Sequence, residues 1–375
     1  MWKRRLKDLV GLAAIAGITG VIVLISGIFP VRASDGHWAI TKWFLDFASN
    51  RSIQTHATGI DVPNLDETGL IRLGAATFDT NCRWCHGIPD LPMPSPASQM
   101  TPRPPNLKPV VTGWDDDELF YIVKHGIKFA GMPAWASPQR DDEVWPVVAF
   151  LKQLPNMSLA DYREHVHPTR FAMQDSADLS DKKGAIVNIV REHCAACHGI
   201  DGNGRAGDRV PKLSSQRKEY LAATLVAYRD GQRFSGVMHP ITVNFTDEEL
   251  RSFATHFSQQ PRKPMITTAV EQDSDITDHG RRLATDGDRE HKLASCNDCH
   301  AVNVDDDEGS GPDRSYPRLA GQPKEYLRRQ LQLFREANRG GSSNASIMIK
   351  IAAKLNDDQI EAVSMFYANE LIDPE

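Results

Sequence analysis

Three short stretches decide how this chain folds: Cys82-Arg-Trp-Cys85-His86, Cys194-Ala-Ala-Cys197-His198 and Cys296-Asn-Asp-Cys299-His300. Each has the form C-x-x-C-H, and together they use all six cysteines of the 375-residue chain. Over one helical turn this spacing places the two thiols on the same side of the helix, and the imidazole of the next residue points to that side as well. A motif that recurs in this way predicts three copies of one structural unit.

The C-x-x-C-H pattern is the attachment sequence of c-type haem, in which two thiols form thioethers and the histidine binds the iron. A single copy would also be compatible with half of a zinc site or with a redox-active dithiol. Three copies that leave no cysteine over favour haem at each motif. The sequence therefore predicts three covalently bound haem c groups, attached through Cys82, Cys85, Cys194, Cys197, Cys296 and Cys299 and bound at iron by His86, His198 and His300.

The N-terminus combines a basic flank with a long apolar run. The flank contains Lys3, Arg4, Arg5 and Lys7. The run from Leu9 to Phe29 is uncharged, and as a helix it would be roughly 31 Å long, close to the ~30 Å hydrocarbon thickness of a bilayer. The basic flank is expected to stay in the cytoplasm, so the rest of the chain is exported. Small residues around Val31-Arg32-Ala33 keep a cleaved signal sequence open as the alternative to a retained anchor.

Composition excludes several other classes of protein. The chain is 41% hydrophobic and 25% charged, which is typical of globular domains and excludes a polytopic membrane protein or a mostly disordered chain. Its net charge of -6 gives no positive footprint for nucleic acid, so no nucleic-acid partner is expected. A chain of 375 residues is long enough for two or three domains that each bury a core.

With these motifs on an exported chain, the sequence resembles the class I cytochromes c. Its second and third copies are similar to the small diheme cytochromes c in which two such domains pair. Val210-Pro211-Lys212-Leu213 matches Tyr316-Pro317-Arg318-Leu319, and the segments 216–221 and 322–327 share Lys-Glu-Tyr-Leu. The resemblance implies an all-α fold of three tandem class I cytochrome c domains behind an N-terminal transmembrane helix. We expect the anchor or signal at 1–34 and the domains at 50–158, 172–262 and 272–375.

In that family a downstream methionine binds the sixth position of the iron. Each copy has one candidate, namely Met132, Met238 and Met348. An acidic residue that opens the last helix follows each methionine at the same interval, at Asp142, Glu248 and Asp358. This shared register favours the three methionines as ligands over the nearby histidines His125, His239 and His291. Met348 has the weakest context, because it follows the Gly/Ser-rich segment 340–343.

The resemblance also assigns a role to one proline in each copy. A proline carbonyl accepts a hydrogen bond from the proximal imidazole, which orients the ring and raises its basicity. The matching positions are Pro105, Pro211 and Pro317, each shortly before a leucine. A plain loop turn is the alternative for any one of them.

The helices that frame each copy can also be predicted. The first and last helices of a class I cytochrome cross, and Gly74 with Phe150 would suit that contact. Thr246 with Glu249, and Asn356 with Gln359, have the spacing of capping boxes at the start of a final helix. Polar and proline-rich linkers are expected at 156–176 and 259–275. The acidic run 305–308 is either a solvated face or a docking patch for a basic partner.

Three six-coordinate haems describe an electron conduit, with no residue expected to be catalytic. We therefore expect a triheme cytochrome tethered to the bacterial inner membrane, with its haem domains in the periplasm. It would carry electrons in a respiratory chain from a quinol-oxidising complex or a periplasmic dehydrogenase towards a terminal oxidase or a soluble carrier. The alternatives are a dedicated cytochrome subunit of a membrane-bound alcohol, aldehyde or sugar-acid dehydrogenase, and a haem enzyme that reduces peroxide.

Overall fold

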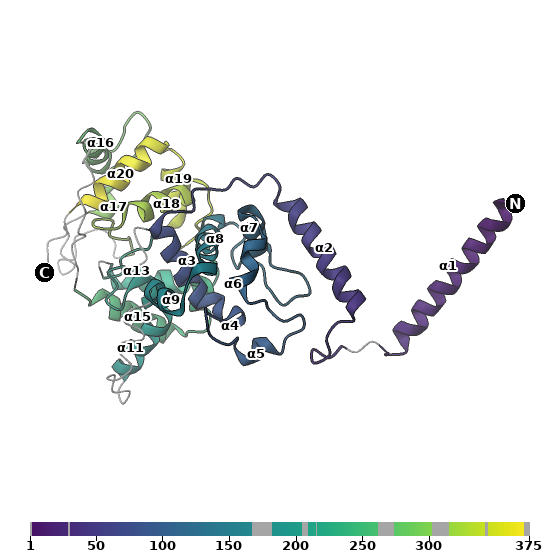
Figure 1. Ribbon diagram of the computed structural model, residues 1–375. Helices are drawn as coiled ribbons and strands as arrows, with labels where there is room; N and C mark the ends of the chain where they lie inside the picture. The colour runs from purple at the N-terminus through teal and green to yellow at the C-terminus, as the bar shows by residue number, and fades with distance from the viewer. Residues whose placement is uncertain are drawn as a thin grey trace.

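The computed structural model describes residues 2–28, 31–166, 182–204, 209–214, 216–261, 274–301, 315–341 and 344–370. In these ranges every regular element is a helix, and only isolated bridges such as that between Ile127 and Met132 have β geometry. The all-α fold is therefore confirmed. Figure 1 shows the N-terminal helix α1 apart from a body built from the remaining helices. The predicted domain limits at 172, 262, 272 and 375 and the acidic run 305–308 lie outside the described residues.

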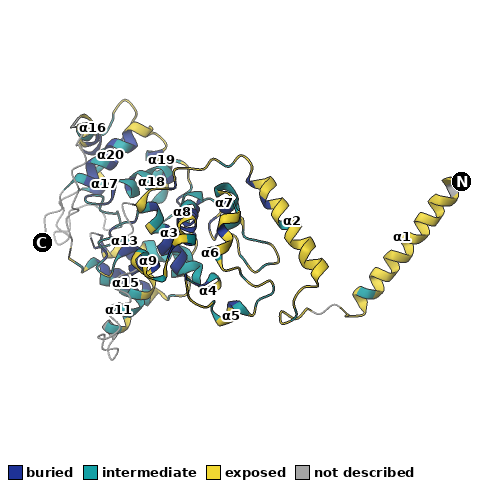
Figure 2. Ribbon diagram, in the orientation of Figure 1, coloured by how far each residue is buried: buried dark blue, intermediate teal, exposed yellow. Residues whose placement is uncertain are grey.

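Helix α1, Trp2–Ile25, has the length and composition of a membrane span. Its segment Arg4–Ile25 has a mean hydropathy of 2.3, and none of it is buried against the rest of the chain. Figure 2 shows that exposure covers most of the helix and continues over most of α2, Ala39–Ala57. A membrane anchor and a secretion signal share these properties.

The first unit surrounds the Cys82 motif. Its helices are α3 (Thr68–Asn81), α4 (Arg83–His86), α5 (Ser95–Ser98), α6 (Leu107–Val110), η1 (Val111–Gly113), α7 (Asp116–His125), η2 (Asp141–Glu143), α8 (Val144–Gln153), η3 (Leu154–Asn156) and α9 (Leu159–Val166). Helices α3 and α8 cross at Gly74, where a Cβ would collide with the Pro146 carbonyl and lie 2.8 Å from Phe150 Cβ. The predicted close contact between Gly74 and Phe150 is confirmed.

Helix α9 differs from the sequence prediction, which placed a linker from residue 156. Tyr162 of α9 is fully buried, and its hydroxyl donates a hydrogen bond to Asp79 Oδ1 at 2.8 Å. Its ring meets Phe78 edge to face, with 6.4 Å between centroids. A single buried aromatic therefore extends the first unit to residue 166, because the helix around it is otherwise polar and carries little hydrophobic periodicity. The rest of this linker lies outside the described residues.

The second unit surrounds the Cys194 motif. Its helices are α11 (Lys182–His193), α12 (Ala195–His198), α13 (Lys218–Arg229), α14 (Met238–Thr242) and α15 (Asp247–Ser258). Helix α15 begins with the predicted capping box: the Thr246 backbone N–H donates to Glu249 at 2.8 Å, and the Glu249 N–H donates to the Thr246 hydroxyl at 3.3 Å. The linker expected to follow, at 259–275, is described only at its two ends.

The third unit surrounds the Cys296 motif. Its helices are α16 (Ser274–Thr285), α17 (Asn297–His300), α18 (Lys324–Arg335), α19 (Ala345–Ala352) and α20 (Asp357–Asn369). The capping box of Asn356 and Gln359 at the start of α20 is confirmed. Helix α20 crosses α16 at Gly280, where a Cβ would collide with the Ala362 carbonyl and lie 2.9 Å from Phe366 Cβ. The first and third units thus use the same glycine-mediated crossing.

The second and third units are joined by two reciprocal amide pairs. The Gln322 side chain accepts from the Lys212 N–H at 3.0 Å and donates to the Lys212 carbonyl at 2.8 Å. The Gln216 side chain accepts from the Arg318 N–H at 3.1 Å and donates to the Arg318 carbonyl at 2.6 Å. Each glutamine thus completes both backbone hydrogen bonds of one residue in the other unit. This pairing follows a local two-fold symmetry, because Gln216 and Lys212 correspond to Gln322 and Arg318 in the repeat.

Candidate functional site

Each C-x-x-C-H motif closes as one helical turn. The turn begins after the first cysteine and ends at the histidine, in α4, α12 and α17. In each turn the histidine N–H donates to the carbonyl of the first cysteine, at 3.0 Å for His86, 3.0 Å for His198 and 2.9 Å for His300. None of the six cysteines is paired in a disulfide. The local structure therefore holds two thiols and one imidazole together three times.

Each proximal histidine faces the carbonyl of the proline that was predicted to orient it. The Nδ1 to carbonyl distances are 3.1 Å for His86 and Pro105, 3.1 Å for His198 and Pro211, and 2.8 Å for His300 and Pro317. Since a carbonyl can only accept, Nδ1 carries the proton and Nε2 keeps its lone pair. Burial lowers the pKa of all three imidazoles, against the opposing effect of the proline carbonyl. A neutral imidazole with a free Nε2 is the form that binds a metal.

The first thiol of each motif is held in its neutral form. Burial, followed by the neighbouring Cys85, raises the pKa of Cys82 to about 12. Burial and Cys197 raise the pKa of Cys194 to about 12. The pKa of Cys296 is raised to about 11, mainly by burial. Thiols in an apolar setting beside an imidazole with a free nitrogen fit the vinyl edge and iron of haem.

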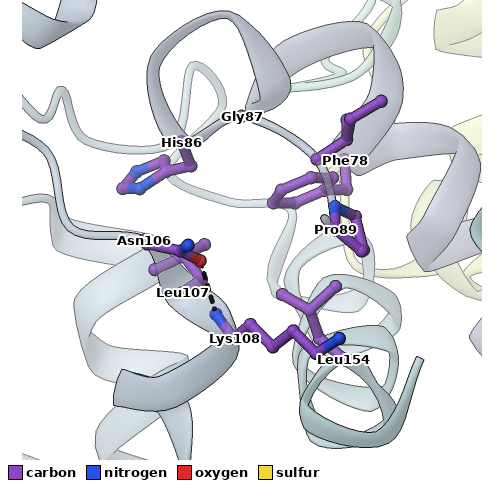
Figure 3. Close-up of a pocket in the computed structure, with 9 residues that line it drawn as sticks. Phe78, His86, Gly87, Pro89, Asn106, Leu107, Lys108 and Leu154 are labelled. Carbon is purple, nitrogen blue, oxygen red and sulfur yellow. Dashed lines mark hydrogen bonds between the residues drawn. The ribbon is translucent and has the colours of Figure 1, made fainter. Parts of the chain in front are cut away.

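A small cavity opens beside His86 in the first unit. Figure 3 shows His86, Phe78 and Leu154 on different sides of the cavity, with the His86 ring turned away from Phe78. The full lining is Phe78, His86, Gly87, Ile88, Pro89, Asn106, Leu107, Lys108 and Leu154. The walls of this small cavity are mostly apolar.

The predicted methionines lie on elements distinct from the motif turns. Met132 follows α7, and its carbonyl accepts the Ile127 N–H at 3.1 Å. Met238 is the first residue of α14. Met348 lies within α19, not in the Gly/Ser-rich segment before it, part of which lies outside the described residues. All three side chains are half-buried, so their role as iron ligands stays a prediction.

The histidines that compete with them have other partners. His239 Nδ1 lies 2.7 Å from the Tyr228 carbonyl. His291 Nδ1 lies 2.7 Å from Asp288 Oδ2, and this hydrogen bond and charge raise the pKa of the imidazole. The His125 ring packs on Tyr121 with 4.6 Å between centroids. The Nδ1 contacts of His239 and His291 leave Nε2 free, as in the motif histidines, so the choice of methionine over histidine stays a prediction.

Two buried arginines lie at the junction of the second and third units. Arg233 is 4% exposed and Arg339 is 8% exposed. Their neighbours are neutral: both guanidinium groups donate to Tyr220, at 3.3 Å each, and to Gln330, at 3.1 and 2.7 Å. In the part of the chain that the structure describes, neither forms an ion pair with a carboxylate, and the charge nearest to Arg339 is that of Arg233. Burial raises the pKa of Tyr220, but the charges of Arg233 and Arg339 outweigh this effect and lower the pKa to about 8.

Buried cations require a counter-charge, so this place fits an anionic group such as the carboxylates of haem. Sequence reasoning did not identify Arg233 and Arg339. A signal existed, because the two arginines occupy corresponding positions after α13 and α18. An arginine in a polar loop is nevertheless exposed in most proteins, and its burial depends on the junction of two units.

Two protein-family models match this chain. Residues 69–151 and 183–256 match the family described as cytochrome c oxidase, cbb3-type, subunit III, and residues 279–368 match the cytochrome c family. Cytochrome c4 of Azotobacter vinelandii is 34% identical over 182 residues, which cover 46% of this chain and 82% of that protein. The thiosulfate dehydrogenase electron acceptor of Stutzerimonas stutzeri is 32% identical over 176 residues, covering 47% of this chain and 78% of that protein.

Among solved structures, reduced recombinant cytochrome c4 from Pseudomonas stutzeri aligns with a TM-score of 0.44 and 30% identity, over 51% of this chain and 100% of that chain. The sequence matches define the class: the chain belongs to the class I cytochrome c family. It is an electron-transfer cytochrome of the periplasmic type, with haem c bound covalently through C-x-x-C-H.

Proposed function

We propose that this chain binds three haem c groups and passes single electrons between redox partners. The observation that carries the proposal is the threefold recurrence of one geometry, a C-x-x-C-H turn whose imidazole Nδ1 faces a proline carbonyl. Haem supplies reversible one-electron chemistry when it is bound. The six cysteines would form the thioethers, and the axial pairs would be His86 with Met132, His198 with Met238, and His300 with Met348. We place the three units at 50–166, 172–262 and 272–375.

The chain's own residues would serve transfer by holding fixed geometry. The proline carbonyls orient the three imidazoles and raise their basicity. The Gln322 and Gln216 amides bind the residues directly after Pro211 and Pro317. A short hydrogen-bonded connection therefore links the two proximal histidines, His198 and His300. We infer that this connection keeps the second and third haems at a constant separation, so that an electron can pass between them.

We assign the buried arginine pair to the haem carboxylates. Arg233 and Arg339 converge on Tyr220 and Gln330 at the junction of the two units. Haem carries two propionates, which would supply the counter-charge that the neutral neighbours lack. Docking of the second unit on the third would then depend on haem attachment, since without it two buried cations lie close together.

The partners follow from the chemistry of transfer. We propose a quinol-oxidising complex or a periplasmic dehydrogenase as donor and a terminal oxidase or soluble carrier as acceptor. Similarity to a thiosulfate dehydrogenase electron acceptor supports a dehydrogenase as donor. The same observation favours the second candidate function, a cytochrome subunit bound permanently to a dehydrogenase. Copurification of a catalytic subunit from solubilised membranes at constant stoichiometry would favour the subunit, and isolation of the cytochrome alone would favour the carrier.

We further propose that α1 tethers the haem units to the periplasmic face of the inner membrane. The first half of α2 supports this arrangement. Ile40, Trp43, Phe44 and Phe47 share one face of that helix and are 52 to 67% exposed. Tryptophan and other apolar side chains are favoured at the boundary between water and lipid. A short segment separates α2 from α1, so this face would lie close to the bilayer.

We expect the protein to stay with the membrane after washing with high salt and with alkaline buffer. Burial of an uncharged helix is insensitive to ionic strength, whereas attachment through charges is screened. The measurement is haem absorbance in the pellet and supernatant of each wash. A truncated form that begins at Ser34 behind a cleavable signal should appear in the soluble periplasmic fraction. Release of the full chain, or a mature N-terminus just after Ala33, would contradict the anchor.

Carbon monoxide separates a carrier from a haem enzyme. With a side chain on each face of all three irons, the reduced protein should bind carbon monoxide slowly and to a minor extent. It should turn over peroxide no faster than a free haem peptide, yet exchange electrons rapidly with small redox proteins, because transfer needs only a brief encounter at an exposed haem edge. Stopped-flow absorbance measures both rates. Rapid stoichiometric binding at one haem would instead indicate an enzyme with an open site, for which Met348 is the weakest ligand.

A further inference from the structure

The segment that leads into α14 is held by a residue of a different unit. Ser235 stands at the centre of this segment, and its hydroxyl oxygen accepts the N–H groups of Val237 at 3.2 Å and Met238 at 3.0 Å. The same hydroxyl donates to Glu143 Oε1 at 2.6 Å. Glu143 Oε2 accepts the Gly236 N–H, also at 2.6 Å. One carboxylate of the first unit therefore binds the two residues that fix where α14, and with it Met238, begins.

Glu143 is itself fixed on every side. Its side chain is 10% exposed and lies 3.0 Å from the Arg140 guanidinium. Trp135 donates its indole N–H to Glu143 Oε2 at 3.3 Å. Burial raises the pKa of Glu143, while the Arg140 charge opposes this. Burial of a carboxylate costs free energy of desolvation, which is offset only where its hydrogen bonds are well oriented. The donors from both units supply such hydrogen bonds to Glu143.

The first unit contacts three consecutive residues of the segment. Glu143 binds Ser235 and Gly236, and Arg140 donates to the Phe234 carbonyl at 2.6 Å. Asn81, the residue before Cys82, donates to the Gly236 carbonyl at 3.4 Å. Gly236 must be glycine, because a Cβ there would collide with the Trp135 indole. The segment is thus clasped between the Cys82 turn and the start of α8.

We infer that Glu143 of the first unit is the positioning residue for the iron ligand of the second unit, Met238. The inference rests on the proposed function, in which Met238 binds the second haem. Glu143 would act through the Ser235 hydroxyl and the Gly236 N–H, which hold the first turn of α14. A thioether is a weak neutral ligand, so its bond to iron depends on how firmly the protein holds it. Ligation at the second haem would therefore require the first unit to be docked.

The test uses the full holoprotein with Glu143→Ala and Ser235→Ala. Glu143→Ala removes both contacts of the carboxylate with the segment, whereas Ser235→Ala removes only those made by the hydroxyl and leaves every charge in place. We expect the sulfur-to-iron charge-transfer band of the ferric protein to lose about one third of its intensity, the share of one haem in three. Carbon monoxide should bind to that haem at least about tenfold faster, in line with the effect of losing an outer hydrogen-bond partner of a metal ligand. One reduction potential should fall, and all three haems should stay attached.

Arg329→Gln is the matched control. It breaks an ion pair between the third and first units, 3.1 Å from Arg329 to Asp142, but leaves the contacts of Glu143 intact. It should change neither the band nor the carbon monoxide rate. Glu143→Gln, which keeps one acceptor oxygen, should restore part of the band lost in Glu143→Ala.

Each other outcome has a definite meaning. An unchanged band in both Glu143→Ala and Ser235→Ala would overturn the positioning role and leave the electron carrier standing. If Glu143→Ala does not fold, Glu143→Gln decides the question, because it keeps the shape of the side chain and weakens only its contacts with Ser235 and Gly236. Failure of the proposed ligation itself would look different, since Met238→Leu would then leave the band of the otherwise unaltered protein intact.

Discussion

A chain that carries Cys296→Ser and Cys299→Ser is expected to mature with two haem groups instead of three. Thioether bonds need thiols, and all six thiols of the chain belong to the three motifs, so no other cysteine can substitute. The mass of the intact unaltered protein should exceed the mass of its polypeptide by three haems, and the variant should lack one. The haem that remains per chain, measured by absorbance in alkaline pyridine, should fall by about one third.

The matched control for this experiment is Met348→Leu in the same unit. It removes the proposed ligand on the other face of the haem but leaves both thiols, so the mass excess should remain that of three haems. The third unit of the cysteine variant should also lose stability, because His300 and Cys296 pack around a cofactor that is no longer attached. An excess of two haems or fewer in the unaltered protein would refute the count.

Single changes of Met132, Met238 and Met348 to histidine are expected to lower one reduction potential each and leave all haems attached. Histidine donates more electron density than a thioether and stabilises the ferric state, whereas attachment depends only on the cysteines. The expected fall is on the order of 100 mV, within the roughly 0.8 V range that axial ligands set. A spectroscopic redox titration of each variant resolves the component that shifts.

Met93→His is the control for the effect of a new imidazole. Met93 belongs to the first unit but stands outside the register of the three predicted ligands, and its sulfur lies 3.4 Å from Arg103 Nε. No potential should change by a comparable amount in this variant. If one of the variants Met132→His, Met238→His and Met348→His leaves the titration unaltered, the methionine changed in it is not the iron ligand of its unit. Met348→His is the most informative of the three, since Met348 lies in α19 and not in a loop.

Much of the fold was predictable because its signals are local. The capping boxes at Thr246 and Asn356 depend on residues three apart, which a sequence shows directly. The contact at Gly74 was predictable because the family resemblance implies a crossing of the first and last helices, and glycine permits a close one. Helix α9 was not, since its place in the fold depends on one tyrosine that reaches Asp79 from 83 residues away.

The chemistry of the three proposed haem sites was determined by the sequence alone. In all three copies the five residues of C-x-x-C-H form one helical turn, so the contacts that hold the two thiols and the imidazole together are local. Each proline that faces a proximal histidine follows it by 13 to 19 residues, a span within a single unit. Hydrogen bonds within one unit hold each of these arrangements.

Only the tertiary structure decided how the units affect one another. Glu143 reaches Ser235 across 92 residues, Gln322 reaches Lys212 across 110, and Arg233 reaches Tyr326 across 93. In the sequence these are an ordinary acidic, amide or basic side chain, each typical of a solvated surface. Their partners are chosen by which preformed faces dock, and no period or spacing in a sequence records that choice. At the junctions between units these side chains are buried and make specific contacts. Glu143 binds the segment before Met238, Gln322 joins the second and third units, and Arg233 supplies positive charge for an anion.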